Sequence, residues 1–349
     1  MRVVVTGATG NVGTSLLQAL ADEPAVESVV GIARRRPKLE LPKVEWAQAD
    51  VGSSELVPLF RGADAVVHLA WLIQPTRDRG LLWKANVDGS TRVFRAAAEA
   101  GVRALVHASS IGAYSPGPKN RPVDESWPTG GIPTNEYSRY KVEVERRLDR
   151  FEREHADVRV VRLRPTLIFK REAATEQRRL FAGPFLPRSL LEPGRLPFVP
   201  HIPEIVFQAV HSYDVGNAYR LAVVGDVRGA FNIAAPPTLD TTVIAQHLRA
   251  RTLRMSARVT RALASVAFHA RVTPIPPSWL DLALGVPLLD TTRAQTELGW
   301  MPSYTGERAI ADLLDGMRHA SGLETPPLSP ETSGPARLRE LATGIGKRP

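Results

Sequence analysis

Three side chains of this sequence have types and spacings that suit proton transfer at a carbonyl or hydroxyl group. Tyr137 and Lys141 are four residues apart, so on a helix they lie one turn apart on the same face. A free tyrosine has a pKa of about 10, and a neighbouring ammonium group favours the phenolate and lowers that pKa. Ser110 follows an apolar run, where its hydroxyl can hydrogen-bond a substrate oxygen. We therefore predict that Tyr137 is a general acid or base, assisted by Lys141 and Ser110.

A glycine-rich segment near the start of the chain has the spacing of a dinucleotide-binding loop. Gly7, Gly10 and Gly13 follow an apolar run that predicts a strand, and they open a segment with helical periodicity. Gly7 allows a tight turn, Gly10 lets the backbone approach a pyrophosphate, and Gly13 lets the helix pack against the strand. This context favours dinucleotide binding over a purely structural glycine turn. The predicted cofactor contacts are Gly7, Thr9, Gly10, Asn11, Val12 and Gly13.

The residues after the second predicted strand bear on which dinucleotide is bound. Proteins that bind NAD through such a loop place a carboxylate there for the ribose hydroxyls, whereas this sequence has Arg34, Arg35 and Arg36. Arginine suits a phosphate because its planar guanidinium donates two parallel hydrogen bonds. We therefore favour NADP(H), with Arg34 and Arg35 at the 2′-phosphate; NAD(H), with the arginines in a solvated loop, is the alternative. Asp50 and Val51, after the third predicted strand, either contact the adenine or form a plain turn.

The order of predicted elements in the first half of the chain indicates the fold class. Short valine-rich runs alternate with amphipathic segments, which is typical of a parallel sheet covered by helices on both faces. Right-handed crossovers then give an α/β fold with a doubly wound Rossmann sheet. The predicted strands are residues 2–6, 28–33, 44–49, 65–70, 104–109 and 158–163, and the predicted helices are residues 11–21, 53–60, 81–100 and 137–155.

The character of the sequence changes halfway along the chain, where prolines become frequent. We predict an NAD(P)-binding Rossmann domain over residues 1–165 and a smaller C-terminal substrate-binding lobe over residues 166–320, with some chain returning to the sheet. Helices in this lobe are expected near residues 243–270 and 305–317. Residues 321–349 are rich in Pro, Ser, Gly and Thr and are expected to be mostly disordered.

The glycine loop, Ser110 and the Tyr137–Lys141 pair together resemble the extended short-chain dehydrogenase/reductase family, which includes NAD-dependent epimerases, dehydratases and ketone reductases. The resemblance covers roughly residues 1–318. It implies that Tyr137 is the acid–base residue, that Lys141 also holds the nicotinamide ribose, and that Ser110 positions the substrate oxygen. Further segments similar to family motifs imply more contacts on the cofactor side, from Leu69, Ala70, Asn86, Tyr137, Lys141 and Pro165.

Two departures from the family pattern narrow the expected chemistry. Family dehydratases carry an Asp-Glu pair directly after the serine, where this sequence has Ile111 and Gly112, so dehydration is not expected. Sugar-nucleotide enzymes of the family often carry an asparagine where this sequence has Leu167, which argues against a nucleotide-sugar substrate. The segment Trp71-Leu72-Ile73 either packs in the core or lines the cleft with apolar walls, which favour a small apolar substrate.

We therefore predict an oxidoreductase that transfers hydride between a nicotinamide and the carbonyl or alcohol of a small, apolar substrate. Two alternatives stay open. One is a sugar-nucleotide 4-epimerase that holds NAD tightly, and the other is a non-catalytic NADP(H)-sensing protein that binds a partner.

Composition limits the other function classes. The 349 residues include no cysteine, which excludes disulfides and thiolate metal ligands, and no metal site is predicted. No signal peptide or membrane-spanning stretch is visible, so a cytoplasmic protein is expected. The net charge of +9 is spread along the chain, and no nucleic-acid-binding motif accompanies it. The family resemblance also allows a homodimer through the predicted helices 81–100 and 137–155.

Four arginines of the predicted lobe, Arg251, Arg254, Arg258 and Arg261, recur at helical spacing beside apolar residues. A basic stripe of this kind contacts a phosphate-bearing ligand or an anionic membrane surface, or it is the solvated face of a helix. The solvated face is favoured, because charge runs on helices usually face water.

Overall fold

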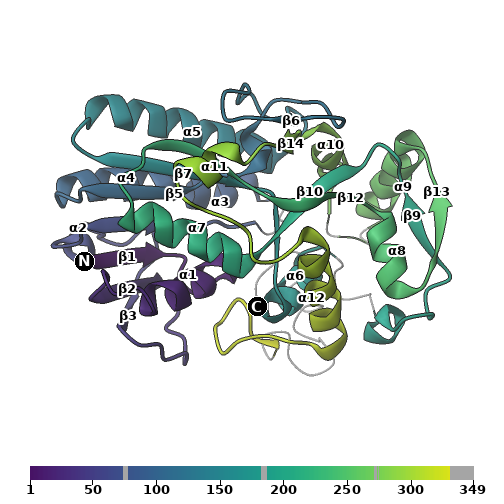
Figure 1. The fold of residues 1–349 in the computed structure, drawn as a ribbon, viewed down its shortest axis with the longest axis horizontal. Helices are drawn as coiled ribbons and strands as arrows, with labels where there is room; N and C mark the ends of the chain where they lie inside the picture. Colours follow the sequence, from purple (N-terminus) through teal and green to yellow (C-terminus); the bar gives the residue numbers. More distant parts are fainter. Residues whose placement is uncertain (74–77, 182–186, 271–272, 274, 331–349) are drawn as a thin grey trace.

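The computed structural model describes residues 1–73, 78–181, 187–270, 273 and 275–330, and its centre is one sheet of seven parallel strands (Figure 1). The strand order β11-β7-β5-β4-β1-β2-β3 runs outward in both directions from β1 and β4. This is the doubly wound α/β sheet predicted from the sequence, and the prediction is confirmed. The strands are β1 (Arg2–Thr6), β2 (Ser28–Ala33), β3 (Val44–Gln48), β4 (Ala65–His68), β5 (Ala104–Ala108), β7 (Arg159–Pro165) and β11 (Gly229–Ile233).

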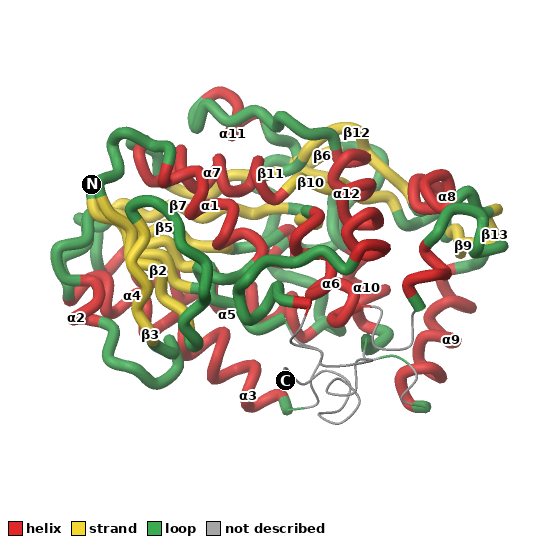
Figure 2. The backbone as a smooth tube through the Cα atoms, turned by 90° about the horizontal axis from the view of Figure 1, so that it is seen from below, coloured by secondary structure: helices red, strands yellow, loops and turns green. Residues whose placement is uncertain are grey.

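Helices cover both faces of this sheet, so its strands are apolar along their whole length (Figures 1 and 2). Val3 and Val5 of β1 belong to the core formed with the first group of helices, whereas Val4 belongs to the core on the opposite face. This alternation follows from the two-residue period of a strand. The first group comprises α1 (Asn11–Ala21) and α7 (Ser212–Val224), and the second comprises α2 (Val57–Phe60), α4 (Gly89–Glu99) and α5 (Glu136–Glu154).

A smaller lobe lies beyond the carboxyl ends of these strands (Figure 1). Among the described residues, three short sheets lie outside the central sheet, namely β12-β10-β8, β13-β9 and β14-β6. None of the helices in the described part of the chain is long and apolar enough to cross a membrane. The strands are β6 (Pro122–Val123), β8 (Leu167–Phe169), β9 (Phe198–His201), β10 (Val206–His211), β12 (Ala235–Asp240), β13 (Arg251–Arg254) and β14 (Leu288–Leu289). The helices are α6 (Ala174–Phe181), α8 (Thr242–Leu248), α9 (Ala257–His269), α10 (Ser278–Gly285), α11 (Thr292–Thr296) and α12 (Gly306–His319), with short 3₁₀ turns η3 (Arg171–Ala173) and η4 (Arg188–Leu191).

The helix predicted at residues 81–100 starts slightly earlier and contains an irregular turn. It begins as α3 (Arg79–Trp83), passes through the π-helical turn η1 (Lys84–Asp88), and continues as α4. A π turn holds one residue more than an α turn, and such turns are frequent at functional sites. Periodicity alone cannot reveal it. The helix predicted at residues 53–60 is shorter than expected, because only α2 (Val57–Phe60) is helical there.

The helical pattern expected near residues 243–270 corresponds to two helices, α8 and α9, and a strand separates them. α8 ends where Arg249 adopts a left-handed conformation with a φ of 49°, and β13 follows. Ser256 then starts α9 by accepting a hydrogen bond from the Val259 backbone N–H. The four arginines of the expected helical stripe therefore lie on two elements: Arg251 and Arg254 on β13, and Arg258 and Arg261 on α9.

The start of the segment expected to be disordered packs against the Rossmann domain. Thr325 and Leu328 are fully buried. The Thr325 hydroxyl donates a 2.9 Å hydrogen bond to the backbone oxygen of Thr9, in the glycine loop. Residues 321–330 are thus ordered, contrary to the expectation of disorder. The Thr325 hydroxyl has a hydrogen-bond partner, and the apolar side chain of Leu328 is removed from water. Residues 331–349 of the expected tail lie outside the described residues.

α1 and α7 pack closely at Gly216, and this contact yields a stability prediction. A Cβ atom on Gly216 would lie 2.7 Å from the backbone carbonyl carbon of Ser15. We expect Gly216→Ala to lower the free energy of unfolding by about 1–3 kcal/mol, although alanine is the better helix former. Gly80→Ala is the matched control, because exposed Gly80 of α3 has no atom closer than 3.4 Å to such a Cβ. Urea unfolding measures both variants, and an unchanged Gly216→Ala stability would contradict the close packing.

Candidate active site

Ser110, Tyr137 and Lys141 come together beyond the carboxyl ends of β4 and β5. Ser110 begins the 3₁₀ turn η2 (Ile111–Ala113), and its Oγ accepts a 3.0 Å hydrogen bond from the Gly112 backbone N–H. Tyr137 lies in the first turn of α5, and a Cβ on Gly112 would lie 2.9 Å from its ring and 3.4 Å from the Ser110 Oγ. The Lys141 Nζ lies 5.8 Å from the centroid of the Tyr137 ring. The structure therefore brings the three predicted catalytic side chains into one place.

Burial controls the protonation of this group. It raises the pKa of Tyr137 to about 12, although the hydrogen bond with Ser110 acts in the opposite direction. Burial also lowers the pKa of Lys141 to about 7, against the attraction of Glu145. The expected lowering of the tyrosine pKa by the lysine does not occur, because burial disfavours the charged form of both groups. The phenol therefore carries its proton at neutral pH.

Two tryptophans flank the tyrosine. The Trp71 ring lies 5.9 Å from the Tyr137 ring in an edge-on contact, and the Lys141 Nζ lies 3.5 Å from the Trp71 centroid. Trp279 of α10 approaches Tyr137 from the lobe, with ring centroids 5.5 Å apart. Within the segment expected either to line the cleft or to pack in the core, Leu72 is buried in the core, and Trp71 is partly buried against it beside Tyr137. Trp279 could not be predicted from the sequence, because no local pattern links it to α5.

Asn86 holds the segment after β4 in place. Its side chain lies in the π turn η1, accepts a 2.7 Å hydrogen bond from the Leu72 backbone N–H, and donates a 2.9 Å hydrogen bond to the Leu72 backbone oxygen. Both hydrogen bonds fix the backbone directly after Trp71. Asn86 therefore positions the tryptophan that contacts Lys141 and Tyr137. The indole Nε1 of Trp71 is buried and has no hydrogen-bond partner in the described structure.

The glycine loop has the shape of a pyrophosphate cradle. Gly7 has a φ of 71°, and a Cβ there would lie 2.6 Å from the Ala70 backbone nitrogen, so Leu69 and Ala70 border the loop. Gly10 caps α1 without a side chain, which leaves the helix N-terminus open to an anion. The Asn11 Oδ1 is buried without a partner among the described residues, as suits a hydroxyl ligand. These features fit a dinucleotide.

The remaining predicted contacts lie around this loop. Arg34 and Arg35 are exposed directly after β2. Asp50 closes a turn, because its carboxylate accepts a 2.8 Å hydrogen bond from the Gly52 backbone N–H. That geometry fits the plain-turn alternative for Asp50. Three others are at least partly buried: Thr9 in the loop, Val12 on α1, and Pro165 at the end of β7.

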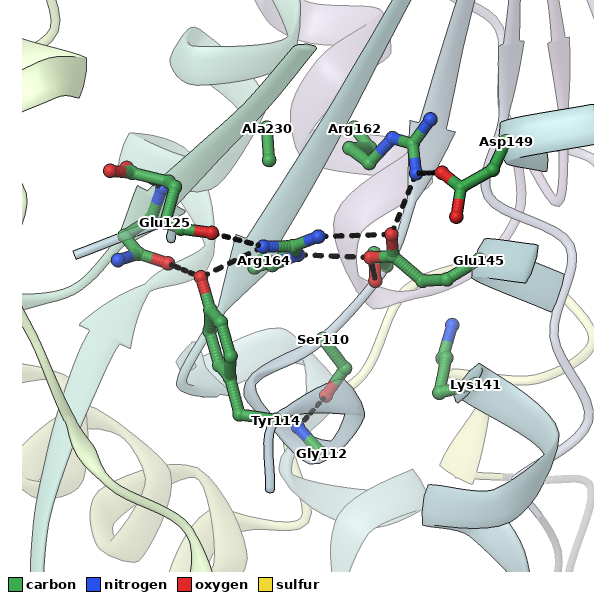
Figure 3. A network of polar contacts seen from close by, with 12 residues as sticks. Ser110, Gly112, Tyr114, Glu125, Lys141, Glu145, Asp149, Arg162, Arg164 and Ala230 are labelled. Carbon is green, nitrogen blue, oxygen red and sulfur yellow. Dashed lines mark hydrogen bonds and ion pairs between the residues drawn. The ribbon is translucent and has the colours of Figure 1, made fainter. Parts of the chain in front are cut away.

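A buried cluster of charges lies beside the catalytic group (Figure 3). Glu145, one helical turn after Lys141, accepts hydrogen bonds of 2.9 and 3.0 Å from the guanidinium of Arg164. It also accepts hydrogen bonds from Arg162, at 2.9 Å, and from Ser109. Burial alone would raise the pKa of Glu145, but the two arginines hold it at about 2. Sequence analysis missed this cluster, although the i, i+4 spacing from Lys141 was a usable signal.

Arg164 extends the cluster to the serine segment. Its Nη1 donates a 3.0 Å hydrogen bond to the Tyr114 hydroxyl, which donates a 2.6 Å hydrogen bond to the Asn232 side chain (Figure 3). Tyr114 follows the turn that Ser110 begins. One guanidinium thus ties α5, β7 and the serine turn together.

The sequence profile of the NAD dependent epimerase/dehydratase family matches residues 3–185, just over half of the chain. The chain belongs to this family. The matched region contains the glycine loop, Ser110, Tyr137 and Lys141. It confirms the resemblance inferred from the sequence and makes the chain a member of a family of NAD-dependent enzymes.

Two relatives match nearly the whole of this chain, and they differ in how much of their own length the match covers. An uncharacterized protein of Mycobacterium tuberculosis is 29% identical over 328 residues, which cover 93% of this chain and 31% of the relative. The chain thus spans about a third of the length of that relative. A second uncharacterized protein of the same species is 25% identical over 338 residues, covering 90% of this chain and 83% of the relative.

Solved structures share the fold. UDP-glucose 4-epimerase from Thermotoga maritima, solved with UDP-glucose, has a TM-score of 0.68 at 19% identity and covers 92% of this chain and 99% of its own. UDP-glucuronic acid 4-epimerase from Bacillus cereus, solved with UDP-glucuronic acid and NAD, has a TM-score of 0.67 at 15% identity, with coverage of 92% and 100%. At these identities the likeness shows the fold.

Replacing the buried carboxylate tests the charged cluster. Glu145→Gln removes the charge that offsets Arg162 and Arg164 but keeps the side-chain size. We expect the free energy of unfolding at pH 7 to fall by about 3–5 kcal/mol. Arg308→Gln is the matched control, because Arg308 is exposed and solvent screens its ion pair with Asp312. Equal losses in urea unfolding would show that the cluster is no stronger than a surface pair.

The same variant carries a pH signature. The pKa of Glu145 is about 2 in the folded chain, and an unfolded glutamate titrates near about 4.3. Because the folded pKa is the lower one, the stabilisation is complete above the unfolded value and is lost as the pH falls to about 2. We expect the stability difference between the unmodified chain and Glu145→Gln to narrow across that interval. A difference that stays constant there contradicts the assignment.

Proposed function

We propose that the chain is an NAD(P)-dependent oxidoreductase that interconverts a carbonyl group and an alcohol on a small, apolar substrate. The observation that carries this proposal is the segment directly after β4. Ala70 borders the glycine loop at Gly7, and the next residue, Trp71, contacts both Tyr137 and Lys141. The proposed cofactor site and the proton-transfer group therefore meet at one edge of the sheet, where ligands of doubly wound folds bind.

Each residue of the group has a role in this chemistry. A bound nicotinamide supplies or accepts the hydride. Tyr137 donates its phenolic proton to the substrate oxygen during reduction and takes a proton from the alcohol during oxidation. Ser110 orients the same oxygen through its hydroxyl. The ammonium form of Lys141 stabilises the phenolate that remains after proton donation.

The aromatic wall favours an apolar substrate. Trp71 and Trp279 contact Tyr137, so a substrate oxygen that reaches the phenol also meets two indole rings. Such rings bind flat apolar groups, and the unpartnered Nε1 of Trp71 can donate a hydrogen bond to a polar atom of the ligand. A ring-bearing ketone or aldehyde fits this chemistry.

NADP(H) is the cofactor that we favour. Arg34 and Arg35 are exposed at the end of β2, where a ribose carrying a 2′-phosphate would lie beside the loop. The family's name and the NAD bound in the Bacillus cereus epimerase make NAD(H) the alternative.

A sugar-nucleotide 4-epimerase with tightly held NAD is the second candidate function. The observation that favours it is the fold shared with two epimerases solved with UDP-sugars. Leu167, which is exposed on β8, offers a diphosphate no hydrogen bond and argues against it. Purified protein that carries NAD and epimerises a UDP-sugar would favour this function over ours. A non-catalytic NADP(H) sensor, the third hypothesis, would bind cofactor but turn over no carbonyl compound.

A homodimer through α4 and α5 accompanies the proposal. Between these helices lies a groove of about 430 Å³. Its charged lining, which includes Arg95, Glu143, Arg146 and Arg150, offers both signs for pairing with a second copy. Sedimentation velocity of the purified chain decides between monomer and dimer.

Tyr137→Phe is the direct test of the mechanism. We expect turnover of aromatic ketones and aldehydes to fall by about 10²–10⁴-fold, because the variant cannot transfer the proton. Dinucleotide affinity, measured by calorimetry, should stay within about twofold. Tyr140→Phe is the matched control, since Tyr140 lies in the same helix and contacts Trp83 instead. Full activity in Tyr137→Phe removes that residue from the mechanism.

Cofactor choice is tested by replacing Arg34 and Arg35 with alanine together. Each charge-assisted hydrogen bond to the 2′-phosphate contributes about 1.5–3 kcal/mol, so NADPH affinity should fall by about 10–100-fold or more. NADH lacks that phosphate, so its affinity should change less than about twofold. Arg150→Ala with Arg153→Ala, both exposed on α5, is the control pair. Calorimetric titration that finds equal losses for the two dinucleotides means that these arginines do not bind the phosphate.

A further inference from the structure

The lobe carries a helix whose apolar stripe faces outward. Val259, Leu263 and Val266 of α9 recur at spacings of four and three residues, so they share one face of the helix. They are 53%, 55% and 68% exposed, and no residue of α9 is buried. More than half of each of these side chains therefore lies outside the packing of the described lobe. An exposed apolar stripe of this kind marks an interaction surface.

The neighbouring strand pair exposes more apolar surface. β9 and β13 pair in parallel with Arg251 opposite Phe198 and Leu253 opposite Pro200, so Phe198 and Leu253 point to the same side of the pair. Both side chains are about half exposed, at 50% and 51%. β9, β13 and α9 lie together at the end of the lobe farthest from the N-terminus (Figures 1 and 2).

The same region is purely basic. Residues 241–280 contain six arginines and no aspartate or glutamate. Arg251, Arg254 and Arg258 are exposed, and no ion pair joins them to an acid in the part of the chain that the structure describes. We define the docking face by its apolar and basic members: Phe198, Leu253, Val259, Leu263, Val266, Arg251, Arg254 and Arg258.

We propose that this docking face binds an anionic membrane surface. Apolar side chains of an interfacial helix enter the boundary between headgroups and acyl chains, while arginines beside them contact lipid phosphates. The long arginine side chains reach the phosphates while the apolar residues insert more deeply. The docking face combines both kinds of side chain on adjacent elements.

A second copy of the chain fits this face less well. A symmetric contact would place the face against itself and bring the arginines of the two copies together. No acid within residues 241–280 could offset that repulsion. Anionic lipid headgroups supply the missing negative charge, so the charges favour a membrane.

The docking face is linked to the candidate active site through one ion pair. Arg261 of α9 donates hydrogen bonds of 2.7 and 3.1 Å to the carboxylate of Asp281 on α10. α10 also carries Trp279, which contacts Tyr137. Docking would hold α10 near the membrane surface, from which an apolar carbonyl compound can reach the tryptophan. This last step rests on the proposed function, whereas docking itself does not.

Co-sedimentation of the full chain with vesicles tests the proposal. Vesicles of equal parts phosphatidylcholine and phosphatidylglycerol should bind the chain, and vesicles of phosphatidylcholine alone should not. Added salt should weaken the binding, because it screens the arginines. Arg251→Gln with Arg258→Gln should lower the partition coefficient by about fivefold for each arginine. Leu263→Ser with Val266→Ser should lower it by about tenfold or more.

Control variants test whether binding depends on the docking face itself or only on net charge and exposed apolar surface anywhere on the chain. Arg61→Gln with Arg153→Gln removes two exposed arginines outside the docking face, and Met301→Ser removes an exposed apolar side chain elsewhere. Both should bind vesicles as the unmodified chain does. Urea unfolding checks that every variant is folded. Reduction of a water-soluble ketone without vesicles should be unchanged in the docking variants, so failure of docking and failure of the proposed function give different results.

Three results would overturn the proposal. One is no binding to the anionic vesicles, and another is equal loss of binding in the docking and control variants. The third is self-association that Leu263→Ser with Val266→Ser abolishes while vesicles stay unbound, which would assign the face to a second copy. Binding that the docking variants lose and the controls keep supports it.

Discussion

The buried ion pair between Glu145 and Arg164 is the interaction on which the geometry of the site depends. It fixes α5 against β7 in one register, because any other register would leave a carboxylate or a guanidinium buried alone at a cost of several kcal/mol. Tyr137, Lys141 and Glu145 follow one another at four-residue spacing on the same helix face. The register set at Glu145 therefore also places the phenol and the amine beyond the strand ends.

The same burial decides how protons are distributed in the site. Away from the arginines it disfavours charge, so the pKa of Tyr137 rises to about 12 and that of Lys141 falls to about 7. A protonated phenol suits the reduction of a carbonyl group, which needs a proton. Oxidation of an alcohol needs the phenolate instead, and a positive charge bound nearby would favour it. The site can serve both directions only if its ligands alter these two pKa values.

The sequence predicts the sheet far better than the lobe. β1 and α1 agree with their predicted bounds because valine runs and the glycine loop are local signals. Arg249 ends α8 in a left-handed conformation that its residue type does not predict, so the helical pattern near residues 243–270 did not reveal the strand between α8 and α9. Trp279 reaches Tyr137 only through tertiary folding, and the raised pKa of Tyr137 follows from burial, which spacing does not reveal. Spacing thus pointed to the proposed catalytic side chains but not to their surroundings.

The arginines of this chain are of two kinds, those paired with a carboxylate and those without one in the described structure. Arg162 and Arg164 share Glu145, and Arg261 has Asp281, so these three join elements of the fold. Arg251, Arg254 and Arg258 lie in a stretch that contains no acid, and they flank exposed apolar side chains instead of bridging helices. An arginine without a neighbouring carboxylate has its five N–H donors available for a phosphate. The distribution of acids along the chain therefore separates arginines that stabilise the fold from arginines that remain available to a ligand.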